Sequence, residues 1–124
     1  FVHSLKTLIN GEPDMEVCDM AESSAEMFRA MKRSHPDMIV LDVMLGEESG
    51  LNVAETLRKE GFDTPVLLIS ALVTPSSKEL QQIGRCVFFR KGDAPALLLR
   101  RARMGLAMSR TNGNTRRSKT AVAA

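Results

Sequence analysis

Three short runs of apolar residues are the most regular feature of this sequence. They cover residues 38–41 (MIVL), 66–69 (VLLI) and 86–89 (CVFF), and none contains a charged or strongly polar member. A short continuous apolar run bounded by polar residues is typical of a strand that is buried on both faces, as in a parallel sheet. A fourth, shorter run centred on Val17 and Cys18 predicts a strand at residues 16–20.

Helical patterns alternate with these strands. Apolar residues recur at helical spacing over residues 1–9, and Asn10-Gly11 predicts the end of that helix. Ser23 and Glu26 have the spacing of a capping box for a second helix, which Pro36 stops.

Three more helices follow from the same signals. Ser49 predicts the start of one, Thr74-Pro75 the start of a short one, and Asp93 the start of a last helix that reaches about Met108. Strands that alternate with helices predict βαβ units, and therefore an α/β fold with a doubly wound parallel sheet.

Each apolar run is followed by a residue with a reactive or charged side chain. Asp42 closes the first run, Ser70 closes the second, and Lys91 follows the third after Arg90. In open α/β sheets the functional residues lie just beyond the carboxyl ends of the strands. A carboxylate, a hydroxyl and an ammonium group together suit the formation and binding of an acyl phosphate. Taken singly, each has a plainer explanation: a helix cap or turn for Asp42, a turn residue for Ser70 and a solvated surface lysine for Lys91.

Composition adds a charge asymmetry. The chain of 124 residues is sized for one domain, and its 15 acidic residues all lie in residues 1–93. The charged residues within 94–124 are all basic: Arg100, Arg101, Arg103, Arg110, Arg116, Arg117 and Lys119. The segment 110–124 is polar, and we expect it to be a basic flexible tail or linker after a domain at 1–109. Binding to an acidic partner or to nucleic acid is the alternative explanation of its charge.

The cysteines and the hydropathy exclude other classes. Cys18 and Cys86 lie in or beside apolar strands and have no CxxC or histidine partner, so we expect free thiols in a reducing cytosol. There is no apolar run of membrane-spanning length and no signal-peptide pattern, which predicts a cytoplasmic protein. The first residue is Phe1 and not Met, which suggests that the sequence begins inside a longer chain.

Residues 1 to about 108 resemble the receiver domain of bacterial two-component response regulators. The resemblance rests on Gly50 at the family's usual distance after the aspartate and on three stretches, HPDMIVLDVML around Asp42, TPVLLISA around Ser70 and FFRK ending in Lys91. It implies a flavodoxin-like receiver fold. It also implies that Asp42 is the phosphoacceptor, that Lys91 pairs with the phosphoryl group and that Ser70 hydrogen-bonds to it.

The same resemblance implies a metal ion and a switch. Mg²⁺ would be held by Asp42 and by the backbone carbonyl of Met44, and Phe88 stands at the position of the family's aromatic switch residue. A buried core aromatic is an equally good interpretation of Phe88. Phosphorylation adds roughly −1.5 to −2 charges, and the signal would be a shift between two packings that both exist beforehand.

One departure from the family is large. The family's first strand, which ends in the acidic pair that binds Mg²⁺, should precede the helix at residues 1–9, and no such strand is present. In the receiver topology that strand lies mid-sheet, between the strands at 16–20 and 38–41. We therefore expect a receiver fold whose first central strand is missing from the sequence, unless another segment or subunit fills the gap. Mg²⁺ binding should be weak or absent.

The predicted function is that of a phosphoacceptor signalling module in a two-component phosphorelay, and not an enzyme. Its partners would be a histidine kinase or a phosphotransfer protein. A second copy of the chain, forming a homodimer, or an output domain are further candidates, and we expect no binding to a membrane. Nucleic acid would be reached only through an output domain. The alternative is a degenerate receiver that binds a partner without phosphorylation. A hydrolase of the haloacid dehalogenase type is disfavoured because Met44 stands where the second aspartate is required.

Overall fold

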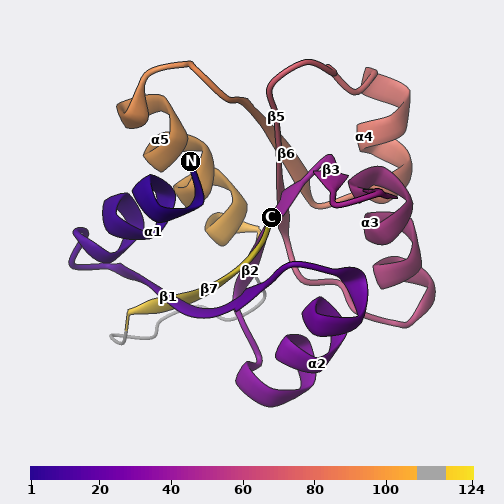
Figure 1. Cartoon of the computed structure of the whole chain (residues 1–124), viewed down its shortest axis with the longest axis horizontal. Coiled ribbons are helices and arrows are strands. Elements are labelled where there is room, and N and C mark those ends of the chain that lie inside the picture. Colours follow the sequence, from indigo (N-terminus) through magenta and orange to yellow (C-terminus); the bar gives the residue numbers. More distant parts are fainter. Residues whose placement is uncertain (109–116) are drawn as a thin grey trace.

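The computed structural model describes residues 1–108 and 117–124, which form a parallel sheet between two layers of helices (Figure 1). The sheet has five strands in the order β1-β7-β2-β5-β6. Every neighbouring pair in it is parallel. The strands are β1 (Met15–Ala21), β2 (Met38–Asp42), β5 (Val66–Ser70), β6 (Cys86–Arg90) and β7 (Ser118–Ala123).

Five helices cover the sheet, as the alternating pattern predicts. They are α1 (Val2–Asn10), α2 (Ser24–Ser34), α3 (Gly50–Lys59), α4 (Ser77–Ile83) and α5 (Pro95–Ala107). A small antiparallel hairpin of β3 (Met44–Leu45) and β4 (Glu48–Ser49) follows β2. Helices α1 and α5 lie on one face of the sheet, and α2, α3 and α4 lie on the other (Figure 1). The predicted doubly wound α/β fold is confirmed.

The side chains of β2 show why its apolar run has no polar member. Ile39 and Leu41 pack in the core beneath α2, α3 and α4, whereas Met38 and Val40 pack in the core beneath α1 and α5. All four are fully buried. Because strand residues alternate between faces, both faces of this strand require apolar side chains.

Two helices begin slightly later than the sequence signals predict. Helix α4 begins at Ser77, because Ser76 and Glu79 form a reciprocal capping box just after Thr74-Pro75. Helix α5 has Ala94 as its N-cap and Pro95 in the first turn, so Asp93 is not its cap. The backbone N–H of Asp93 instead donates to the carbonyl of Arg90 in the preceding turn.

The largest difference from the prediction concerns the C-terminal segment. Residues 118–123 form β7, which pairs with both β1 and β2 and so fills the central position that the sequence leaves empty. Ala121, Val122 and Ala123 are buried there. The prediction of a flexible tail is therefore wrong for residues 118–123, and residues 110–116 of that tail lie outside the described part of the chain. A buried slot between two strands gives a weakly apolar segment hydrogen-bond partners on both sides, which local composition does not reveal.

Two basic residues of the C-terminal part, Arg103 and Arg117, have acidic partners within the same chain. Arg103 pairs with Glu12 and Asp14, at 2.6 and 3.0 Å. The Arg103 guanidinium lowers the pKa of the Asp14 carboxyl below its usual value. Arg117 donates to the backbone carbonyls of residues 10, 12 and 15 and lies 3.8 Å from Glu16. Part of the charge asymmetry is thus matched internally, and Arg117 fixes the start of β7 against the turn after α1.

The fit of β7 is imperfect at one buried position. The side chain of Thr120 is fully buried, and its hydroxyl finds no hydrogen-bond partner among the described residues. The pairing of β7 with β1 also shifts register between Val17 and Asp19. An unpaired buried hydroxyl costs roughly 1–3 kcal/mol, so Thr120 lowers the stability that β7 gives to the sheet.

The strand order also explains the two thiols. Cys18 lies on β1 and Cys86 on β6, which are the opposite edges of the sheet, and both are free. Burial raises the pKa of the Cys86 thiol to about 12. The prediction of free thiols agrees with this arrangement, since cysteines on opposite edges of the sheet cannot crosslink within one molecule. Among the described residues, no helix has the length and apolarity needed to cross a membrane.

We predict that Thr120→Val stabilises the protein by about 1 kcal/mol, because valine has nearly the same shape and removes the unpaired buried hydroxyl. Urea denaturation followed by circular dichroism would measure the change. The matched control is Thr56→Val, since the hydroxyl of Thr56 is exposed and donates to the carbonyl of Asn52. An equal change in the free energy of unfolding for the two variants would mean that residues 118–123 do not occupy the sheet.

Candidate functional site

The carboxyl ends of β2, β5 and β6 bring together the three polar residues that the sequence singles out. Strand β5 lies between β2 and β6, and Asp42, Ser70 and Arg90 are each the last residue of their strands. Asp42 pairs in register with Ile69, and Ser70 pairs with Arg90, the residue before Lys91. The three side chains therefore start from adjacent points along one edge.

Asp42 and Lys91 form the closest ionic contact of the site. The Lys91 Nζ lies 2.6 Å from Asp42 Oδ2, and their side chains are 25% and 12% exposed. The other carboxylate oxygen of Asp42 accepts a hydrogen bond of 2.9 Å from the backbone N–H of Met44. Both oxygens of a largely buried carboxylate are thus held, which satisfies the requirement that a buried charge be paired.

Ser70 is buried at the end of β5, and its hydroxyl is already in contact with the following loop. The hydroxyl oxygen accepts a 3.0 Å hydrogen bond from the backbone N–H of Val73. The backbone of Lys91 is tied to the same residue, because its N–H donates to the Ser70 carbonyl at 2.8 Å. A hydroxyl that accepts one bond keeps its own hydrogen for an acceptor, so Ser70 can still donate to an anion.

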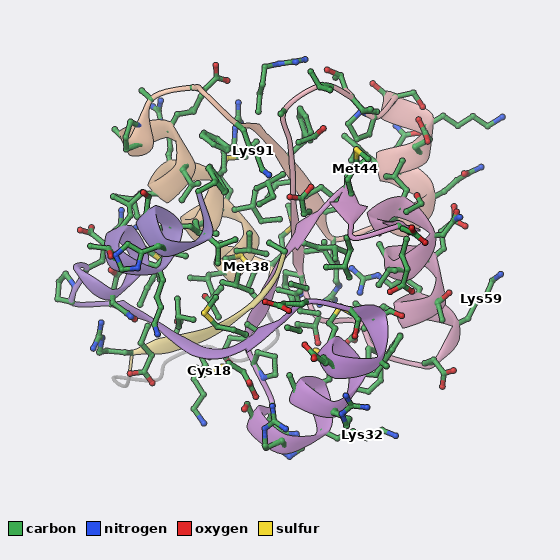
Figure 2. All side chains as sticks on the ribbon, in the orientation of Figure 1. Cys18, Lys32, Met38, Met44, Lys59 and Lys91 are labelled. Carbon is green, nitrogen blue, oxygen red and sulfur yellow. The ribbon has the colours of Figure 1, made fainter. Side chains whose placement is uncertain are left out.

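The other two residues that the resemblance marks have different surroundings. Met44 lies in β3, close after Asp42, and its side chain is 63% exposed. Figure 2 shows Met44 and Lys91 at the same end of the molecule. Phe88 is half-buried and packs against the apolar core beneath α2, α3 and α4. It packs as a core aromatic does. Its role as a switch residue stays a prediction.

Gly50 holds the loop after Asp42 against the end of β2. Its N–H donates to the Val43 carbonyl at 2.6 Å. A Cβ at this position would lie 2.1 Å from the Asp42 carbonyl oxygen and 2.8 Å from the Val43 Cα. Only a residue without a side chain allows this approach, which is the structural reason for the glycine that the sequence places eight residues after Asp42.

The described residues fit a magnesium ion poorly. Receiver domains generally bind Mg²⁺ in an acidic pocket, and Mg²⁺ prefers oxygen ligands from carboxylates. Strand β7 places Ala123 in register with Leu41, so Ala124 follows at the level of Asp42 where a carboxylate would be needed. Within residues 1–108 and 117–124, no three side chains of histidine, cysteine, aspartate or glutamate are placed to share a metal ion.

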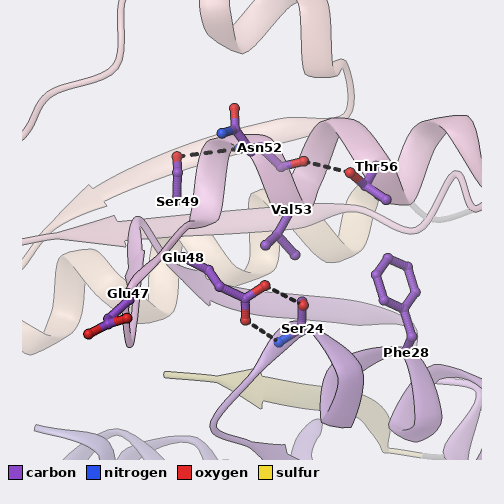
Figure 3. A pocket seen from close by; sticks show the side chains of 8 residues that line it. All are labelled: Ser24, Phe28, Glu47, Glu48, Ser49, Asn52, Val53 and Thr56. Carbon is purple, nitrogen blue, oxygen red and sulfur yellow. Dashed lines mark hydrogen bonds between the residues drawn. The ribbon is translucent and has the colours of Figure 1, made fainter.

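Two contacts near the site give no signal in the sequence. The Lys91 Nζ lies 4.8 Å from the centre of the Phe1 ring, a contact between residues 90 positions apart. The carboxylate of Glu48, in β4, accepts hydrogen bonds from the backbone N–H and the hydroxyl of Ser24 at the start of α2 (Figure 3). This contact closes one side of a pocket between α2 and α3, whose lining also includes Phe28 and Asn52.

Comparison with known proteins agrees with this fold. The sequence profile of the response regulator receiver domain matches residues 1–103. The chain therefore belongs to the receiver domain family of two-component response regulators. A receiver domain is not itself a catalytic domain.

The chain is also similar to particular proteins in sequence or in fold. The chain is 35% identical over 68 residues to a protein-glutamate methylesterase/protein-glutamine glutaminase of Pyrococcus abyssi, a match that covers 55% of the chain and 18% of that protein. The response regulator domain of Thermotoga maritima CheB has a TM-score of 0.74 at 22% identity, covering 87% of this chain and 89% of that one. The BeF3-activated receiver domain of Klebsiella pneumoniae RstA has a TM-score of 0.67 at 27% identity, covering 83% and 90%. The chain spans less than two fifths of the length of the first curated relatives that it matches.

We predict that Gly50→Ala destabilises the protein by about 1–3 kcal/mol, because the added methyl group must push back the end of β2. The urea midpoint gives the change in stability, and the Asp42 and Lys91 amide resonances in an NMR spectrum should shift with it. Gly11→Ala is the matched control, since Gly11 has a φ of −73° and its nearest neighbour would be 3.3 Å away. A Gly50 variant as stable as the Gly11 variant would contradict the close approach.

We also predict that Ala124→Asp tightens Mg²⁺ binding by about tenfold, because affinity for hard cations rises with the number of carboxylate ligands. A magnesium titration followed through the amide resonances of the strand ends would measure it. Ala107→Asp adds the same charge near the end of α5, close to the start of β6, and should leave the affinity unchanged. If both variants bind Mg²⁺ as the parent chain does, β7 does not end beside Asp42.

Proposed function

We propose that Asp42 is the phosphoacceptor of this receiver domain and that Lys91 and Ser70 bind the phosphoryl group once it is attached. The observation that carries the proposal is the 2.6 Å contact between Asp42 and Lys91, at a strand edge that also holds a buried hydroxyl. Acyl phosphate formation needs a carboxylate nucleophile, a fixed positive charge and a hydrogen-bond donor. The strand ends supply one of each.

The transfer step follows from these three groups. A carboxylate oxygen of Asp42 attacks phosphorus, the bond from phosphorus to the donor atom breaks, and the donor leaves with the electron pair and takes up a proton. The Lys91 ammonium neutralises part of the charge on the phosphoryl oxygens, which is the main requirement of phosphoryl transfer. The Ser70 side chain rotates to bring its hydroxyl to a phosphoryl oxygen and so gives up the hydrogen bond from the Val73 N–H, and the loop after β5 then changes conformation.

Phe88 is the candidate for passing that change to the surface. It is half-buried on β6 and adjoins Leu68 across the pairing of β5 with β6. Movement of the loop after Ser70 would alter the space available to its ring, and two packings of one aromatic side chain can then differ in population. The surface formed by α4, β6 and α5 is the one that would change.

The charge geometry favours phosphorylation over the alternative of a degenerate receiver. A binding domain without phosphoryl chemistry has no need of a buried lysine–aspartate pair, and a paired buried charge is often neutral or unfavourable for stability. Among the described residues no cluster of three carboxylate, histidine or cysteine side chains could hold a metal ion, which argues for weak Mg²⁺ binding, and hence for slow phosphorylation, rather than for none.

The wider setting is proposed on the family resemblance. The phosphoryl donor is a histidine kinase or a phosphotransfer protein, and the receiver unit comprises residues 1–109 together with β7. An output domain elsewhere in a longer chain or a homodimer would read the changed surface, and contact with nucleic acid would require such an output domain. We place the protein in the cytoplasm, where those partners act.

Phosphorylation can be tested directly with acetyl phosphate and Mg²⁺ followed by intact-mass spectrometry. We expect the mass of one added phosphoryl group in the parent chain and no addition in Asp42→Asn, because an amide cannot act as the nucleophile. Asp93→Asn removes an exposed carboxylate in the turn after β6 and should be labelled at the parent rate. Labelling that persists in Asp42→Asn, or its absence from the parent chain even at high Mg²⁺, would reject the proposed function.

A further inference from the structure

The Lys91 ammonium has a second partner besides Asp42. It lies 4.8 Å from the centre of the Phe1 ring, within the range in which an aromatic face attracts a cation. The same nitrogen lies 2.6 Å from Asp42 Oδ2. Lys91 is therefore shared between a carboxylate and an aromatic face, and the two come from elements far apart in the sequence.

The position of Phe1 is set by the start of α1. The carbonyl of Phe1 accepts the first hydrogen bond of α1, from the N–H of Leu5, at 2.8 Å. Its ring lines an apolar pocket between α1 and α5 together with Leu5, Phe89 and Leu98. Phe1 is 49% exposed, and its place at the start of α1 brings its ring beside the ammonium.

We propose that Phe1 is a positioning residue for Lys91 in the phosphoryl transfer reaction, an inference that rests on the proposed function. Before transfer the ammonium pairs with Asp42, which is the nucleophile. During transfer it must release that oxygen and follow the phosphoryl oxygens. The ring attracts the cation through both stages, because its interaction does not depend on which anion the ammonium contacts, and it keeps water from one side of the nitrogen.

A positioning role differs from a packing role in one measurable way: it needs the charge on Lys91. We therefore compare Phe1→Leu, which keeps apolar bulk but has no aromatic face, in two backgrounds, the parent chain and Lys91→Met. The rate of labelling by acetyl phosphate at fixed Mg²⁺ is the readout. Phe28→Leu, on the opposite face of the sheet, is the matched control, and urea midpoints are measured for every variant.

We expect Phe1→Leu to slow labelling about threefold in the parent chain, with no further slowing in the Lys91→Met background. Phe1→Trp, with a stronger aromatic face, should restore or exceed the parent rate. An equal effect of Phe1→Leu in both backgrounds would show that the ring acts only by packing. No effect in the parent chain would overturn the proposal while leaving the role of Asp42 intact.

A second readout does not depend on phosphorylation. Protons of the Lys91 side chain next to the nitrogen should show an upfield ring-current shift that Phe1→Leu abolishes and Phe28→Leu leaves unchanged. Absence of that shift would reject the Phe1–Lys91 contact whether or not the chain accepts a phosphoryl group. Failure of labelling in the parent chain with the shift present would instead reject the proposed function.

Discussion

The pairing of β7 between β1 and β2 is the constraint on which the rest of the structure depends. Without it, β1 and β2 would each have an unpaired edge at the centre of the molecule, and buried backbone groups without partners are costly. With it, the sheet is continuous, α1 and α5 share one core, and the end of β2 is held in place. The position of Asp42 follows from that continuity.

Strand β7 makes both favourable and unfavourable contacts in this position. Its alanines fill a narrow slot, Arg117 anchors its start, and the backbone of Lys119 exchanges hydrogen bonds with Asp37 at the start of β2. Against this stand the unpaired hydroxyl of Thr120 and the shift in register with β1. Strand β7 completes the sheet, but its side chains include no carboxylate at the edge where Asp42 lies.

Two glycines, Gly50 and Gly105, lie so close to β2 or the residue after it that a side chain would not fit. Gly105 weakens helix α5 by roughly 1 kcal/mol relative to alanine, yet a Cβ there would lie 2.6 Å from the Met38 sulfur. Gly50 shows the same principle more strictly, since its neighbours are backbone atoms of Asp42 and Val43 that cannot turn aside. In both places a local loss of helix stability allows an element to pack against β2.

The sequence by itself determined β2, β5 and β6, because a strand buried on both faces needs a continuous apolar run, which is visible in the sequence. It also determined which polar residues end those strands, and therefore that Asp42, Ser70 and Lys91 share one edge. Only the tertiary structure decided that residues 118–123 enter the sheet, since a strand of small and polar residues is stabilised by partners on both sides and not by its own composition. The same is true of the Phe1–Lys91 contact, because an attraction between residues at opposite ends of the chain arises from folding and leaves no periodic trace.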